Sequence, residues 1–156
     1  MKRIADVLRI ILVSVETLWL LAVVSLFLWR VTWLSFVGQS LLKHEDVTTW
    51  MPVLPVALCG TAFLLVFKLL APTEAHNKIL YSWPDYWRLE YRRNIGVAWC
   101  VLSVVLVLVA WIFRAELSSE WIGGLFVASI GLATISSGSM MLGVCALKVI
   151  IEKHSD

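Results

Sequence analysis

Charged residues and cysteines are scarce in this sequence, and both scarcities narrow the range of functions. Only 15% of the 156 residues are charged and the net charge is +2, so overall charge does not favour a nucleic-acid-binding protein. The three cysteines, Cys59, Cys100 and Cys145, lie in apolar runs without a CxxC motif or a zinc-type spacing. We interpret each as a small buried side chain. We expect no structural disulfide, because the three thiols are expected at different depths.

Catalytic motifs are also missing. The sequence has no HExxH, GxSxG or P-loop pattern, and His44, His76 and His154 stand alone, without a paired histidine that would hold haem. The glycine-containing segment 123–131 lies inside an apolar run and is unsuited to a dinucleotide loop. The serines of "SSGSMM" at 136–141 have no base partner in the sequence. We therefore predict no enzymatic activity, no metal site and no cofactor.

The sequence is rich in long apolar runs. Hydrophobic residues make up 60% of the chain and the mean hydropathy is +0.87, far above an ordinary soluble domain. About 20 helical residues cross about 30 Å of hydrocarbon, and four stretches reach that length. The expected spans are residues 10–29, 53–70, 95–113 and 121–147. Residues 1–156 are thus predicted to be one all-α membrane domain, a four-transmembrane-helix bundle.

The basic residues predict the orientation. Three of the thirteen lie in the first and third connections, namely Arg30, Lys43 and Arg114. The other ten lie at the N-terminus, in the second connection with the end of the preceding span, and in the C-terminal tail: Lys2, Arg3, Arg9, Lys68, Lys78, Arg88, Arg92, Arg93, Lys148 and Lys153. The positive-inside rule therefore places both termini and the 71–94 loop in the cytoplasm, in a bacterial inner membrane.

The first connection, residues 30–52, is the larger of the two on the opposite side. Its segment "TWLSFVGQSLL" leaves two interpretations open. The segment either extends the first helix or lies flat on the bilayer surface. The third connection, residues 114–120, is short enough for a tight hairpin between the last two spans.

The cytoplasmic segment 81–94, "YSWPDYWRLEYRRN", combines aromatic residues with arginines. Ser82, Pro84 and Asp85 are typical of a helix start. On that helix one stripe holds Trp83, Tyr86, Trp87 and Tyr91, and other positions hold Arg88, Arg92 and Arg93. Such residues anchor a helix to the anionic inner leaflet, and they are also the usual anchors of protein interfaces. Lipid anchoring and partner docking therefore both stay open.

Glu16 is the carboxylate placed well inside a span, about six residues past the entry and roughly 9 Å deep. A charge in the bilayer is costly, so Glu16 is expected to face protein or water. Lys68, near the end of the second span, is its predicted partner at the same leaflet. The pair is interpreted either as structural or as an ion or proton site.

Small residues recur in the fourth span at about every 3.5 positions. They are Gly124, Ala128, Gly131, Thr134 and Gly138. Small side chains let helix backbones approach closely in lipid. The pattern fits packing inside the bundle and packing between subunits, and the small size of the bundle favours a homo-oligomer.

Two resemblances follow from these features. At Glu16 the sequence resembles the small multidrug resistance transporters, four-span proteins with an essential glutamate in the first helix, which implies a proton and cation site at Glu16. The layout of four spans, cytoplasmic termini and almost no soluble domain resembles membrane subunits of bacterial defence operons, such as that of the Kiwa anti-phage system. That resemblance implies a homo-oligomeric platform for a cytoplasmic effector.

The sequence therefore predicts a homo-oligomeric inner-membrane platform or sensor that recruits a cytoplasmic protein in anti-phage defence. Residues 81–93 and the tail "KVIIEKHSD" are the predicted recruiting segments. Lipids of the anionic inner leaflet and further copies of the chain are the other expected partners, without direct nucleic-acid binding. The alternative is a small ion or proton-coupled transporter, or a channel, that uses Glu16.

Overall fold

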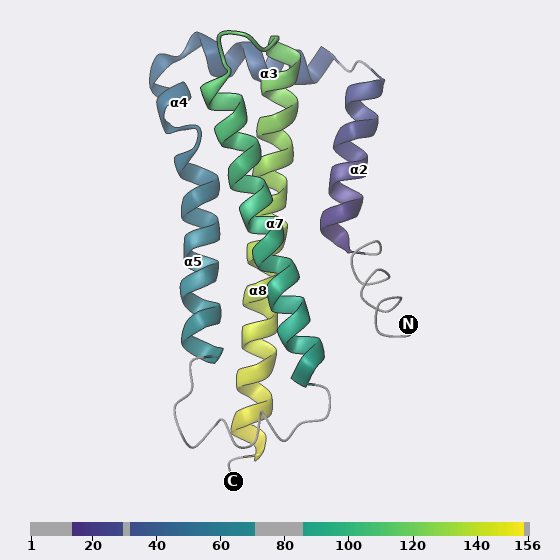
Figure 1. The fold of residues 1–156 in the computed structure, drawn as a ribbon, viewed down its shortest axis with the longest axis vertical. Coiled ribbons are helices and arrows are strands. Elements are labelled where there is room, and N and C mark those ends of the chain that lie inside the picture. The colour runs from purple at the N-terminus through teal and green to yellow at the C-terminus, as the bar shows by residue number, and fades with distance from the viewer. Residues whose placement is uncertain (1–13, 30–31, 71–85, 155–156) are drawn as a thin grey trace.

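The computed structural model describes residues 14–29, 32–70 and 86–154, and the regular structure in these ranges is entirely α-helical (Figure 1). The predicted all-α class is thus confirmed. In chain order the helices are α2 (Val15–Leu28), α3 (Thr32–Lys43), α4 (Glu45–Trp50), α5 (Val53–Leu70), α7 (Tyr86–Ile112) and α8 (Ser119–His154).

The described ranges contain three helical segments long and apolar enough to cross a membrane. They are Asp46–Leu64, Glu90–Ile112 and Ser119–Cys145. A fourth is reached only if α2 and α3 count as one span broken by a 96° bend. The expected first span, residues 10–29, begins outside the described residues, and α2 covers the part of it from Val15 onward. The helix content thus supports a membrane protein with three or four spans.

Helix α8 is the central element, and it packs against α2, α3, α5 and α7 (Figure 1). The core where α5, α7 and α8 meet consists mainly of small residues: Cys59, Ala62, Cys100, Ala133 and Met140. Small side chains allow the close helix approach from which association in lipid gains its van der Waals energy. A second core lies toward the α3 end and comprises Leu41, Met51, Val107, Ala110 and Ile122.

Helix α3 crosses the first turns of α8 instead of continuing α2. Its buried residues, Leu34, Gly38 and Leu41, are spaced as one helical face. At the crossing the backbones nearly touch, because a Cβ added to Gly38 would overlap the Ser119 carbonyl and one added to Gly123 would overlap the Leu34 carbonyl. Of the two interpretations of "TWLSFVGQSLL", extension of the first helix is therefore wrong.

The cysteines depart from expectation in two ways. Cys59 and Cys100 share one core, and the Cys59 thiol donates to the Cys100 carbonyl oxygen at 3.7 Å. The expectation of different depths is wrong for this pair, because α5 and α7 run in opposite directions and their middle turns meet (Figure 1). Cys145 is exposed instead of buried, since its side of α8 faces away from the bundle.

Candidate functional site

Glu16 lies in the first turn of α2, where the helix dipole favours a carboxylate. Ser14 caps this helix, and its hydroxyl oxygen accepts a hydrogen bond from the Thr17 amide at 3.2 Å. Only 8% of Glu16 is exposed, so its carboxylate points into the bundle. The first turn of α2 thus presents an acidic group to the neighbouring helix α8.

In the structure Glu16 contacts a serine of α8, Ser139. The Ser139 hydroxyl lies 3.4 Å from a Glu16 carboxylate oxygen and also donates to the Ser136 carbonyl at 3.0 Å. One serine of "SSGSMM", Ser139, therefore has an acidic neighbour, contrary to the expectation from sequence. Lys68 lies in α5, but its side chain is outside the described residues, so the Glu16–Lys68 pair stays a prediction.

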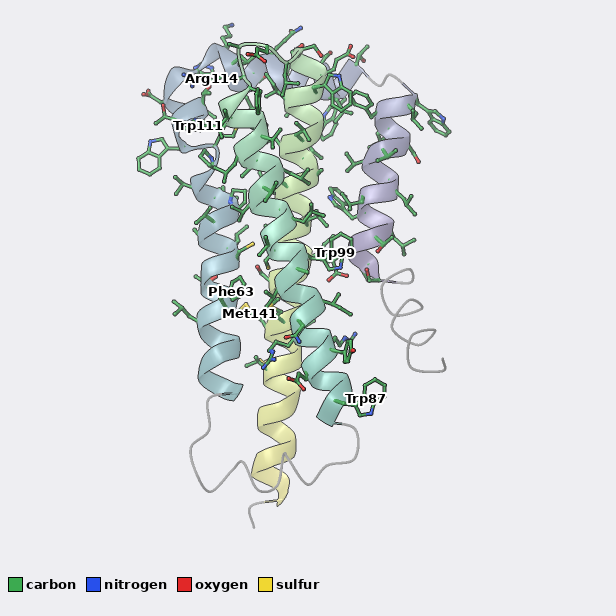
Figure 2. All side chains as sticks on the ribbon, viewed as in Figure 1. Phe63, Trp87, Trp99, Trp111, Arg114 and Met141 are labelled. Carbon is green, nitrogen blue, oxygen red and sulfur yellow. The ribbon has the colours of Figure 1, made fainter. Side chains whose placement is uncertain are left out.

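Three polar side-chain atoms in the described part of the chain are buried without a hydrogen-bond partner on the helices that meet around α8. Within the described residues, the Ser136 hydroxyl and the indole nitrogens of Trp19 and Trp99 are buried without a hydrogen-bond partner. Trp99 points from α7 toward the start of α2 (Figure 2). Buried polar groups are usually paired, so the α2–α7–α8 junction is unusually polar for an apolar bundle.

A chain of side-chain hydrogen bonds ties α8 to its neighbours deeper in the bundle. The Ser103 hydroxyl donates to the Ser129 carbonyl and the Ser129 hydroxyl donates to the Ser103 carbonyl, each at 2.9 Å. The Ser137 hydroxyl donates to the Leu58 carbonyl of α5 at 3.0 Å. Sequence reasoning missed Ser103 and Ser129, whose one signal is a serine inside an apolar run.

The small residues of the fourth span divide between two surroundings. Gly124 and Gly131 face α2, because added Cβ atoms would meet the rings of Phe27 and Trp19, and Ala128 between them is buried. Thr134 is exposed and bonds only its own helix, at the Ile130 carbonyl. A Cβ at Gly138 meets no described atom within 4 Å. Gly124, Ala128 and Gly131 thus pack against other helices of the same chain. Thr134 and Gly138 are not covered by any described residue.

The aromatic and arginine segment lies only partly within the described residues. Trp83 is outside them, and so are the side chains of Tyr86 and Arg88. The Trp87 and Tyr91 rings meet edge to face, with centroids 6.1 Å apart, as their spacing of four implies. Arg93 pairs with Glu90 at 3.5 Å, whereas Arg92 is exposed. Docking and lipid anchoring by this segment stay predictions.

A second aromatic group lies at the opposite end of the bundle, and sequence reasoning missed it. We call it the aromatic collar. Its exposed members are Trp29, Trp33, Phe36, Trp50, Trp111, Phe113 and Trp121. The available signal was that each of these residues except Phe36 lies near a helix end.

No group of three or more His, Cys, Asp or Glu side chains that could hold a metal ion occurs among the described residues. No protein-family model, no curated protein and no solved structure matches the chain. The resemblances to the Kiwa membrane subunit and to the small multidrug resistance transporters therefore stay predictions, and the function is argued from geometry alone.

Proposed function

We propose that the chain is a homo-oligomeric inner-membrane platform or sensor that recruits a cytoplasmic protein. The observation that carries this proposal is the length of α8. Its 36 residues extend about 54 Å at about 1.5 Å per residue, whereas the hydrocarbon core is about 30 Å thick. Its sequence stays largely apolar as far as Ile151, and the helix then ends in Glu152, Lys153 and His154. Because the helix is longer than the hydrocarbon core is thick and ends in polar residues, its last turn would project into water as a surface for a partner.

The start of α7 lies at the same end of the bundle as the last turns of α8 (Figure 1). Tyr91 and Arg92 are exposed there, and tyrosine and arginine are frequent anchors of protein interfaces. The excess of basic residues in the segments at this end favours a cytoplasmic location. The predicted resemblance in layout to the Kiwa membrane subunit extends the proposal to anti-phage defence.

Charge removal tests the recruitment. The variant with Arg88, Arg92 and Arg93 all changed to Ala should lose a soluble protein that co-purifies with the wild type in mild detergent. The matched control changes Arg30, Lys43 and Arg114 to Ala, which removes the same charge from the opposite end and should retain the partner. Equal recovery of the partner with both triple variants would refute docking at this segment.

A second candidate function is supported by Glu16. A carboxylate that is 8% exposed inside an apolar bundle is costly, and such residues commonly mark ion or proton paths. The contact with Ser139 places a polar group from a second helix beside it. A small transporter or channel that uses Glu16 is therefore the alternative to the platform.

Flux measurements in liposomes separate the two candidates. Glu16→Gln keeps the size of the side chain and removes the charge, so it should abolish proton-coupled cation uptake or change conductance if the alternative holds. Glu120→Gln is the control, because Glu120 is exposed in the first turn of α8. Wild-type liposomes that show no flux of protons or cations would eliminate the alternative and leave the platform.

A further inference from the structure

The aromatic collar is contributed by almost every part of the bundle. Trp29 follows α2, Trp33 and Phe36 lie in α3, and Trp50 ends α4. The remaining members, Trp111, Phe113 and Trp121, lie where α7 gives way to α8. Figure 2 shows Trp111 and Arg114 together at this end, far from Trp87 at the other. Five of the six described helices, or the residues directly after them, thus supply the collar.

Helix α3 has one face on the bundle and one face uncovered by the described residues. Leu34, Gly38 and Leu41 are buried against the bundle. Phe36 is 66% exposed, and Lys43 lies seven residues later on the same face. An outward face that combines phenylalanine with a cation and with the polar Gln39 and Ser40 suits neither pure water nor pure hydrocarbon.

The depth of α3 follows from its contacts with α8. Gly38 contacts the backbone carbonyl of Ser119, and the backbone carbonyl of Leu34 contacts Gly123. Ser119 is also the first residue of α8 and of its candidate membrane span. The crossing therefore lies at the start of that span. Because α3 is bent by 96° from α2, which runs along the bundle, α3 runs across the end of the bundle (Figure 1).

We propose that α3 is an interfacial helix whose exposed face, together with the aromatic collar, binds phospholipid at the boundary between headgroups and acyl chains. Tryptophan prefers this boundary, because its ring is apolar while its N–H bonds headgroup oxygens. Lys43 and Arg114, both exposed at this end, add cations at the level of the phosphates. Lipid accounts for exposed aromatic residues on five different elements without requiring that they form one continuous patch.

Spin labelling in lipid vesicles tests this proposal and does not depend on recruitment. In a Cys145→Ser background, which removes the exposed native thiol, Phe36→Cys is labelled and reconstituted with phosphatidylcholine and phosphatidylglycerol. Collisions with oxygen, which enters hydrocarbon, are compared with collisions with a water-soluble nickel complex. Val105→Cys, exposed in mid-α7, serves as the lipid reference, and Glu116→Cys in the hairpin serves as the water reference.

The expected oxygen-to-nickel ratio at Phe36→Cys lies between the two references and on the oxygen-rich side of their midpoint. Trp33→Cys, one position from the buried Leu34, should give the same result. Because it is a second, separate position, a structural change caused by one substitution cannot by itself decide the test. A nickel-rich signal equal to that of Glu116→Cys at both positions would overturn the proposal. Low collision rates with both reagents at both positions would also overturn it, because protein and not lipid would then cover α3.

Discussion

Two serine hydroxyls show what single residues contribute to this bundle. Ser103 and Ser129 are fully buried and exchange hydrogen bonds across α7 and α8. Each hydroxyl donates to the backbone carbonyl of the other residue, and the two hydroxyl oxygens lie 3.4 Å apart. Bonds of this kind between helices in membranes average about 0.6 kcal/mol and reach about 1.7 kcal/mol.

We expect Ser103→Ala and Ser129→Ala each to lower the free energy of unfolding by about 0.6 kcal/mol, because each removes one donor and leaves a similar volume. The two hydroxyls lie 3.4 Å apart and residues in contact couple, so the loss in the double variant should differ from the sum of the two by about 0.5 kcal/mol or more. Unfolding in mixed detergent micelles, followed by circular dichroism, measures all three variants. A double variant that loses the simple sum of the two would contradict this coupling.

Residue contacts are also where prediction from sequence reached its limit. That Glu16 faces protein follows from the cost of a charge in lipid, and the structure places it at 8% exposure. That Ser139 is its neighbour depends on how α8 is rotated relative to α2, and one sequence does not contain that angle. The same holds for Ser103 and Ser129, whose pairing requires α7 and α8 in one rotational register.

At the scale of elements, the crossing of α3 over α8 depends on two glycines. A Cβ on Gly123 would overlap the Leu34 carbonyl oxygen and lie 3.0 Å from the Gly38 amide nitrogen. Both obstacles are backbone atoms, which cannot move aside as a flexible side chain does. Any larger residue at Gly123 must therefore push the two helices apart.

We expect Gly123→Ala to lower the free energy of unfolding by about 1–3 kcal/mol, the usual cost of overpacking. Gly143→Ala is the matched control in the same helix, because an added Cβ there meets no described atom within 4 Å. It should be neutral or stabilise by up to about 1 kcal/mol through helix propensity. Equal effects of the two substitutions, measured by unfolding in mixed micelles, would show that the crossing is not tight.

The open half of the small-residue pattern on α8 bears on oligomerisation. An added side chain at Gly138 has space among the described residues of one chain, so Gly138→Leu should leave the unfolding midpoint nearly unchanged. If a second copy packs on this face, the same substitution should shift native mass spectra from oligomer to monomer. An oligomer that survives Gly138→Leu intact would exclude this face as the subunit contact.

Elements were more predictable than contacts. Runs of apolar residues indicated helices over α5, α7 and α8, because only a helix of that length satisfies its own backbone in lipid. The direction of α3 stayed open, since its alternation of Leu34, Gly38 and Leu41 with polar residues fits a surface helix as well as an extended span. Contact with Gly123, which lies far away in the sequence, decides between the two.

At the scale of the whole molecule, the bundle has two chemically different ends. One end carries the aromatic collar, with the exposed cations Lys43 and Arg114 beside it. The other holds the exposed Arg92 and the last turns of α8, which end in Glu152, Lys153 and His154. The proposed platform requires this second end to face the cytoplasm. If the molecule were inverted, the recruiting surface would be outside the cell.

Orientation is therefore the most direct test, and a membrane-impermeant thiol reagent measures it in intact bacteria. In the Cys145→Ser background we predict that Lys78→Cys is labelled only after the cells are permeabilised. Glu116→Cys, in the hairpin between α7 and α8, should be labelled in intact cells. Labelling of Lys78→Cys in intact cells, with Glu116→Cys protected until permeabilisation, would contradict the platform.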